Sequence, residues 1–381
     1  MAAPVSTAEP AGLLPVLPLV PISDLNWPAI REAALAAPQI RQRMHVTVPQ
    51  IEIRMDQADG PGLLFDGCRT HAGDKAIQVS QDLYAESADR PLWIIGDLHG
   101  DLLALEASLA LIAAHSEAPP RIVFLGDLFD DEGLGLETVL RVFELILQMP
   151  GRVCLMAGNH DEALSFNGAR FASSVNPSDF ADQLNAQLAH EWVVRAGKVL
   201  VRLVAAAPRA LFFPDGLLIA HGGFPLVDLH ARLQETGDWN DPACLSDFVW
   251  SRAHPKARRK MPNRFSRGSQ FGFEDFADFC KVSAALGRKV THMVRGHDHP
   301  EERVAVYPAY QQHPLLTTVA LSRRLPRERF GPYERWPTLA RVVPGSLPQP
   351  YQLQIPSDLV REVFPFSEPD GDVAATVEDP V

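Results

Sequence analysis

The sequence predicts a layered fold of the α/β class, and two observations carry that prediction. Short apolar runs alternate with longer segments in which apolar residues recur at helical spacing, so strands and helices follow one another along the middle of the chain. The apolar runs at 92–95, 122–125 and 153–156 each lead into a loop that carries Asp or His. Ligands bind outside the carboxyl ends of strands in sheets built with crossover helices. The sequence therefore predicts a ligand site at these loops.

The bulk composition is that of an ordinary globular protein. With 381 residues, 46% hydrophobic and 22% charged, the chain can form one large domain with extensions or two ordinary domains. A formal net charge of −12 argues against nucleic acid as the main partner, because phosphate backbones require clustered Lys and Arg. No apolar run reaches the roughly 18 residues that suggest a membrane span. The sequence does not indicate an oligomeric state.

The cysteines and the start of the chain favour a cytoplasmic location. Cys68, Cys154, Cys244 and Cys280 are widely spaced and form no CxxC pair, which is typical of a reducing compartment. The apolar tract within residues 1–21 is interrupted by prolines and has no basic segment before it, so we do not expect a cleaved signal peptide.

Residues 1–88 are interpreted as an N-terminal extension that packs on the main domain. Residues 1–24 are rich in Ala and Pro and are expected to be ordered only where they dock. Residues 24–43 predict one or two short helices, whereas 46–54 alternate as a strand does, with Pro49 marking an edge or a break.

The main domain is predicted at 89–345. Helices are expected at 102–114 and 134–147, between the three apolar strands, and at 179–195. Further strands are expected at 217–220, 290–294, 315–320 and 339–343. Residues 346–381 form a C-terminal extension, whose acidic tail from Phe366 onward is expected to be disordered.

The chemistry of the loops points to metal ions. Asp and His are costly to bury unpaired, yet here they follow the most apolar runs of the chain, and a pair of divalent cations would neutralise them. Asp97 and His99 are two residues apart and can reach one ion from one tight loop, while the carboxylate of Asp127 can bridge two ions. Asn159, His221 and His297 can complete the second ion. Mixed oxygen and nitrogen ligands suit manganese, with iron or zinc as alternatives, rather than calcium.

Five motifs together resemble one family. They are GDLHG at 96–100, GDLFD at 126–130, GNHD at 158–161, HGG at 221–223 and RGH at 295–297. In this order they resemble the phosphoprotein phosphatases of the calcineurin-like metallophosphoesterases, over about residues 90–345. The resemblance implies a central β-sandwich flanked by helices. It also implies hydrolysis of phosphate monoesters by direct attack of a hydroxide activated by two metal ions.

The resemblance also implies roles for particular residues. Asp97, His99 and Asp127 would bind the first metal, and Asp127, Asn159, His221 and His297 the second. His160 would be the general acid that protonates the leaving oxygen, oriented by Asp130. That pairing is physically sensible, because a carboxylate partner raises the pKa of an imidazole and keeps its proton available near neutral pH.

Two departures from the family's usual sequence concern phosphate binding. The family usually has DRG where this chain has Asp130-Asp131-Glu132-Gly133, so an acid stands in place of a phosphate-binding arginine. It usually has Trp-Ser-Asp where this chain has Trp250-Ser251-Arg252. We therefore hypothesise that Arg252 supplies part of the phosphate clamp, with help from Arg295 and Arg170, because bidentate Arg binds phosphate well.

Two further points stay open. His299, in GHDH, matches a metal-binding His of the wider superfamily, and it is either a ligand or a residue just outside the ligand set. The arginines of the loop between the last two strands are interpreted as a solvated basic surface, with phosphate recognition as the alternative; they are Arg323, Arg324, Arg327 and Arg329.

Three functions fit these observations. The leading hypothesis is a metal-dependent phosphatase acting on phosphoserine or phosphothreonine in proteins. The second is a small-molecule phosphoesterase or a dinucleoside polyphosphate hydrolase, which the altered DRG region favours. The third is a non-catalytic binding protein on the same fold, which the retention of every expected metal ligand opposes.

Overall fold

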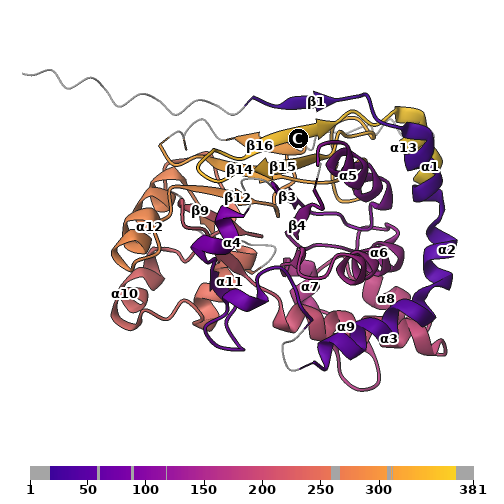
Figure 1. The fold of residues 1–381 in the computed structure, drawn as a ribbon, viewed down its shortest axis with the longest axis horizontal. Helices are drawn as coiled ribbons and strands as arrows, with labels where there is room; N and C mark the ends of the chain where they lie inside the picture. The colour runs from indigo at the N-terminus through magenta and orange to yellow at the C-terminus, as the bar shows by residue number, and fades with distance from the viewer. Residues whose placement is uncertain are drawn as a thin grey trace, which may run out of the picture.

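The computed structural model describes residues 18–57, 61–86, 90–116, 118–258, 267–306, 310 and 312–365. Two six-stranded sheets form the centre of the molecule, and helices lie outside them (Figure 1). The first sheet has the order β1-β16-β15-β3-β4-β5, with bounds Val20–Ile22, Gln349–Leu353, Thr338–Val342, Leu92–Ile95, Arg121–Phe124 and Val153–Leu155. The second has the order β13-β14-β12-β9-β8-β2, with bounds Val304–Val306, Leu315–Thr318, His292–Arg295, Leu217–Ala220, Ala210–Phe212 and Ala76–Gln78.

The two faces of each sheet bury different apolar clusters, because successive side chains of a strand point to opposite faces. In β3, Leu92 and Ile94 share a core cluster with Leu217 and Ile219 of β9, which places that cluster between the sheets. The alternate residues of β3, including Trp93, belong to the cluster shared with helices. Strand β3 therefore has no polar face, as its continuous apolar sequence predicts.

Separate groups of helices cover the outer face of each sheet (Figure 1). The first sheet is covered by α1 (Trp27–Leu35), α2 (Ala37–Gln42), α3 (Met44–Met55), α5 (Leu102–Ala114), α6 (Gly135–Gln148), α8 (Asp179–Ala186), α9 (Glu191–Ala206) and α13 (Ser357–Val363). The second is covered by α10 (Val227–Thr236), α11 (Pro242–Trp250) and α12 (Phe273–Ala285). The short elements that complete the fold are η1 (Asp66–Cys68), α4 (Gln81–Ala85), α7 (Asn159–Ala163), β6 (Leu164–Phe166), β7 (Phe171–Ser173), β10 (Arg252–Ala253) and β11 (Gln270–Phe271).

The predicted β-sandwich flanked by helices is confirmed, and two local predictions are wrong. The alternating segment 46–54 lies in helix α3, which contains Pro49. Its buried residues are Met44, Thr47, Val48 and Ile51, a helical spacing that packs on α6 and α9 and outweighs the alternation. The helix predicted at 179–195 is two helices, since α8 ends at Ala186 and α9 begins at Glu191.

Both flanking ranges contribute strands to the sheets. β1 and β2 come from residues before 89, and β16 comes from residues after 345. The division into extension, catalytic domain and C-terminal extension stays a prediction. Residues 1–17 and the predicted tail from Phe366 lie outside the described residues.

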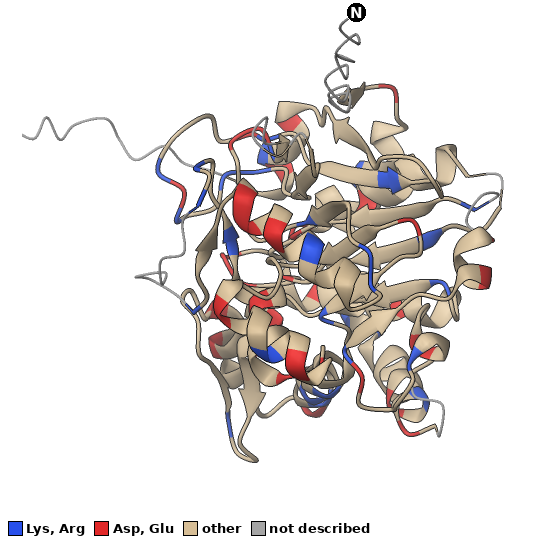
Figure 2. Ribbon diagram, turned by 90° about the vertical axis from the view of Figure 1, so that its left-hand side faces the viewer, with Lys and Arg blue, Asp and Glu red and all other residues tan. Residues whose placement is uncertain are grey.

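Two surface properties bear on partners. No helix within the described ranges combines the length and the apolar character needed to cross a membrane. On the side of the molecule in Figure 2, basic and acidic residues are interspersed along the helices and loops.

Candidate metal centre

The five motif loops meet in one buried cluster. Asp97 and His99 follow β3, Asp127 follows β4, His221 follows β9 and His297 follows β12. Each of these residues is at most 3% exposed. Their donor atoms fall into three groups in which all atoms lie within 4.8 Å of one another: Asp97, His99 and His299; His99, Asp127 and His160; and Asp127, His221 and His297. The side chains that the sequence assigns to two neighbouring ions are therefore together.

The backbone of these loops is tightly folded around the ligands. Asp127 and His297 adopt positive φ values of 51° and 67°, a region that most residues avoid. A Cβ atom at Gly296 would lie 2.1 Å from Oδ1 of Asp97, and one at Gly158 would lie 2.2 Å from Oδ1 of Asp127. Only glycine permits these approaches, because it has no Cβ atom. The carboxylates of Asp97 and Asp127 can therefore lie against the backbone at Gly296 and Gly158.

Two imidazoles are oriented as metal-binding histidines are. Nδ1 of His99 lies 3.0 Å from the carbonyl oxygen of Phe129, and Nδ1 of His221 lies 3.1 Å from that of Leu125. A backbone carbonyl accepts only from N–H, so Nδ1 carries a proton in both imidazoles, and in their neutral form Nε2 has the free lone pair. Nε2 of His99 is 3.6 Å and Nε2 of His221 is 3.4 Å from Oδ2 of Asp127. A second hydrogen bond that fixes the tautomer is characteristic of metal-ligating His.

The electrostatics of the cluster suit divalent cations. Burial favours the neutral form of Asp127, but the neighbouring His221, His160 and His99 hold its pKa well below the usual range. Burial lowers the pKa of His221, and the carboxylates of Asp127 and Asp97 more than offset this, so its pKa rises to about 9. Two buried carboxylates surrounded by imidazole nitrogens are the hard and borderline donor set that binds Mn, Fe or Zn. The residues present therefore fit a two-ion site.

Asn159 and His299 each contact one member of this donor set. Oδ1 of Asn159 is 3.2 Å from Nε2 of His221. Nε2 of His299 is 2.9 Å from Oδ2 of Asp97, and its side chain is 10% exposed. His299 thus contacts Asp97 and belongs with Asp97 and His99 to one of the three groups of clustered donors.

His160 and Asp130 form a buried pair next to the cluster. Nδ1 of His160 lies 2.6 Å from Oδ2 of Asp130, and the backbone N–H of His160 donates to Oδ1 of Asp127 at 2.9 Å. Asp130 is itself held, because its Oδ1 accepts from the N–H of Phe180 at the start of α8 at 2.9 Å. Burial lowers the pKa of His160, but Asp127 and Asp130 exceed that effect and the net pKa is raised. The imidazole is therefore held so that Nε2 faces away from Asp130.

The three arginines expected to bind phosphate occupy different environments. Nη1 of Arg252 donates to the carbonyl oxygen of His297 at 2.9 Å, so this side chain borders the cluster. Arg295 is 0% exposed, and its guanidinium contacts Asp298, Thr317 and backbone carbonyl groups. Arg170 is exposed in the hairpin of β6 and β7, where its backbone N–H donates to Asn167.

The interpretation of the late arginine loop as a solvated surface is wrong for Arg323, whereas Arg327 is exposed but also contacts the cluster. Arg323 is 4% exposed and donates to the carbonyl oxygen of Asp131 at 2.8 Å. Nη2 of Arg327 lies 3.2 Å from Nε2 of His99, and its Nη1 lies 3.4 Å from Nε2 of His160. No local sequence signal links this loop to His99, Asp131 and His160, which lie more than 150 residues earlier in the chain.

Asp161 and Asp101 are buried aspartates in or next to the motifs, and no role was predicted for them. Asp161 accepts backbone N–H groups from Asp127 at 2.5 Å and Gly158 at 2.9 Å, so it joins the second and third motif loops. Asp101 caps α5 by accepting from Ala104, and it accepts from both the N–H and the hydroxyl of Ser322 at 2.7 Å. Asp161 belongs to GNHD and Asp101 directly follows GDLHG, and these positions could have indicated a role for both residues.

The chain is similar to known phosphoesterases. The family model described as calcineurin-like phosphoesterase matches residues 90–301. The serine/threonine-protein phosphatase 6 catalytic subunit of Caenorhabditis elegans is 26% identical over 166 residues, which cover 42% of this chain and 46% of that protein. A protein phosphatase 2A catalytic subunit of Dictyostelium discoideum is 22% identical over 217 residues, covering 54% and 62%. The chain thus spans less than two thirds of the length of these two relatives.

A solved structure of a protein serine/threonine phosphatase from Saccharomyces cerevisiae is also similar. It is 17% identical, with a TM-score of 0.47, and the match covers 68% of this chain and 75% of that one.

Proposed function

The chain belongs to the family of calcineurin-like phosphoesterases, and from this premise we propose that it hydrolyses phosphomonoesters at a two-metal centre. The observation that carries the proposal is the buried cluster in which Asp127 lies between His99 and His221. A buried carboxylate flanked by imidazoles on both sides has the chemistry of a ligand shared by two ions.

The ligands divide into two sets around Asp127. Asp97, His99 and Asp127 would hold the first ion, with His299 beside them, and Asp127, Asn159, His221 and His297 would hold the second. Two bound divalent ions lower the pKa of a water molecule and stabilise the charge of a transferred phosphoryl group. Manganese is our first choice of metal, and iron and zinc suit the same donors.

His160 supplies the proton in this proposal. Asp130 fixes the imidazole through Nδ1, so Nε2 is the nitrogen available to a leaving oxygen. The raised pKa keeps His160 protonated to higher pH than a free imidazole, which suits a general acid.

Phosphoserine and phosphothreonine proteins are the substrates we favour, in a cytoplasmic setting. The two relatives described above are named as serine/threonine-protein phosphatase and protein phosphatase catalytic subunits, which supports this choice. A small phosphoester or a dinucleoside polyphosphate is the second candidate. It is favoured by Asp131, a buried acid 3.1 Å from Nδ1 of His99, and by Glu132 after it, which stand in the sequence where a phosphate-binding cation is expected.

A substrate panel on one purified preparation tests the proposal. The protein is loaded with Mn²⁺ and assayed on an aryl phosphate, phosphoserine and phosphothreonine peptides, nucleotides and dinucleoside polyphosphates. We expect hydrolysis of the aryl phosphate and of the peptides. Turnover of nucleotides with inert peptides would move the assignment to the second candidate. A metal-free protein that hydrolyses none of these compounds after Mn²⁺ addition would favour a binding protein.

A further inference from the structure

We propose that Arg327 binds the phosphate group of the substrate, supplying from the loop after β14 the cation that the second motif loop lacks. This inference rests on the proposed function and adds to it the residue that grips the substrate.

The position of Arg327 is the first argument. Its two terminal nitrogens reach Nε2 of His99 at 3.2 Å and Nε2 of His160 at 3.4 Å. These nitrogens belong to a proposed metal ligand and to the proposed general acid, so the guanidinium lies beside both of these residues. An Arg guanidinium offers two parallel donors to the oxygens of a phosphate.

Charge at that position is the second argument. A guanidinium is a cation, and Nη1 of Arg327 lies 3.4 Å from Nε2 of His160, the proposed general acid. A cation at this point attracts an anion that binds beside the proposed general acid. A phosphate dianion is the anion that the proposed reaction brings to this place.

Asp131 aims the guanidinium. Oδ2 of Asp131 lies 3.0 Å from Nη2 of Arg327 and 3.1 Å from Nδ1 of His99. Asp131 is 2% exposed, whereas the side chain of Arg327 is 35% exposed. The buried acid therefore fixes one edge of the guanidinium and leaves the other side open to a ligand.

The loop on both sides of Arg327 is rigidly held. Glu328 accepts from Nη1 and Nη2 of the buried Arg303 at 2.6 and 2.8 Å, and it also accepts from the N–H of Leu325 at 2.9 Å. Ser322 is bound to Asp101 at the start of α5, two residues after His99. A cation presented by such a loop loses little conformational freedom when it binds an anion.

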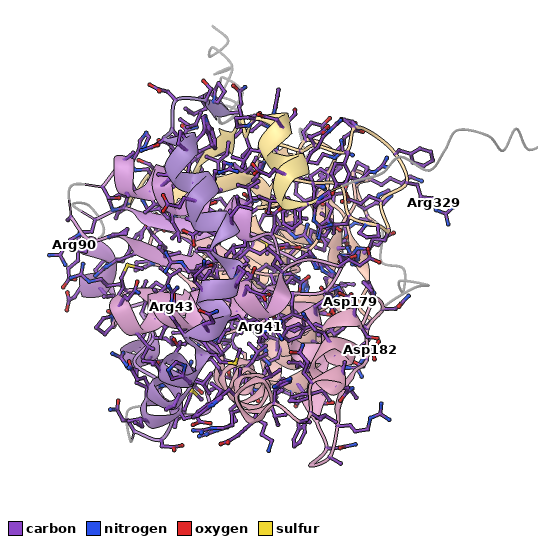
Figure 3. All side chains as sticks on the ribbon, turned by 90° about the vertical axis from the view of Figure 1, so that its right-hand side faces the viewer. Arg41, Arg43, Arg90, Asp179, Asp182 and Arg329 are labelled. Carbon is purple, nitrogen blue, oxygen red and sulfur yellow. The ribbon has the colours of Figure 1, made fainter. Side chains whose placement is uncertain are left out.

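The test compares three variants of the full chain loaded with Mn²⁺. Arg327→Ala removes the guanidinium, and Arg327→Lys keeps the charge that faces Asp131 but loses the two-donor geometry. Arg329→Ala is the matched control, because Arg329 is an exposed arginine of the same loop and points away from the body of the molecule (Figure 3). KM and kcat for an aryl phosphate and the inhibition constant of inorganic phosphate are measured for each, with the melting temperature.

We expect Arg327→Ala to raise KM and the inhibition constant of phosphate by about 10- to 100-fold, the worth of a charge-assisted pair of hydrogen bonds. The KM and the phosphate inhibition constant of Arg327→Lys should lie between those of Arg327→Ala and of the wild type. Those of Arg329→Ala should match the wild type. Unchanged KM and phosphate inhibition in Arg327→Ala would overturn the inference while leaving the proposed function intact.

A chemical readout that needs no turnover separates the two proposals. Phenylglyoxal modifies accessible arginines, and mass spectrometry measures the fraction modified at Arg327 and at Arg329 with and without inorganic phosphate. Protection of Arg327 alone would support the inference even for a preparation that hydrolyses nothing. Equal modification with and without phosphate would contradict it, and so would equal protection of Arg329.

Discussion

The loops after β3, β4 and β5 and the loop after β14 reach the same centre by different means. The first three carry their ligands within a few residues of a strand end, where adjacent parallel strands bring them together. The loop after β14 brings Arg327 to the centre through contacts with Asp131 and Asp101, residues far away in the sequence. The proposed metal ligands are thus encoded locally, whereas the proposed substrate contact depends on tertiary packing.

This contrast predicts that substitutions in the two regions have separable effects. If Asp127 is a shared ligand, replacing it changes metal binding, since the residue belongs to two of the groups of clustered donors. Replacing Arg327, which is in none of these groups, is expected to alter substrate binding instead. Variants in the two regions should therefore differ in metal content as well as in activity.

The largest effect is expected for Asp127→Asn. The change removes the charge that the two ligand sets share, and metal affinity should fall by more than the roughly 10- to 100-fold that loss of an outer partner costs. Metal content after dialysis and activity on an aryl phosphate measure the outcome. Asp182→Asn, an exposed position on α8 labelled in Figure 3, is the control and should retain both. Full metal content in Asp127→Asn would contradict the shared-ligand assignment.

His160→Gln should have the next largest effect. Loss of a general acid lowers kcat by about 10²- to 10⁴-fold, and the loss should be smaller for an ester with a good leaving group. Comparing kcat for p-nitrophenyl phosphate and for an alkyl phosphate gives the measurement, with metal content as the control. An equal loss on both esters would argue that His160 does not donate the proton.

The sequence was sufficient for most of the metal centre and for the order of the strands that form it. The strand predicted at 92–95 is β3, and the neighbouring strands and the helices at 102–114 and 134–147 agree to within a residue or two. These elements depend on local apolar patterns and on motif spacing. The clustering of Asp97, His99, Asp127, His221 and His297 followed from the geometry of strand ends.

Other features of the fold and of the site depend on tertiary packing, which no local sequence pattern indicates. Helix α3 is a helix because one side of it is buried on α6 and α9, although its sequence alternates as a strand does. Likewise, the burial of Arg323 against Phe364, whose ring centroid lies 4.8 Å from the guanidinium carbon, could not be read from an arginine-rich loop. The fully buried Arg303, which directly precedes β13, supports that loop by donating to Glu328.

Glu328→Gln tests whether the loop must be anchored. The change removes the charge that pairs with the buried Arg303, which should cost about 1–3 kcal/mol of stability. We expect a lower melting temperature and a higher KM, because Arg327 next to it is no longer held in place. Glu334→Gln, which alters a carboxylate paired with the largely exposed Arg361, is the control and should change stability by about 0–1 kcal/mol. A destabilised Glu328→Gln variant with unchanged KM would separate the anchor from substrate binding.

Asp131→Asn should have the smallest effect on KM. It tests most directly whether substrate binding and metal binding depend on different residues. An amide can still contact Arg327 and His99 but no longer carries the charge that aims the guanidinium. Since Arg327 is partly exposed, the lost ion pair is worth about 0.5–1 kcal/mol, which corresponds to a rise in KM of roughly 2- to 5-fold. Metal content should stay at the wild-type level, because Asp131 lies outside the three groups of clustered donors. A variant that lost its metal would instead place Asp131 among the ligands, and the second motif loop would then serve only the ions.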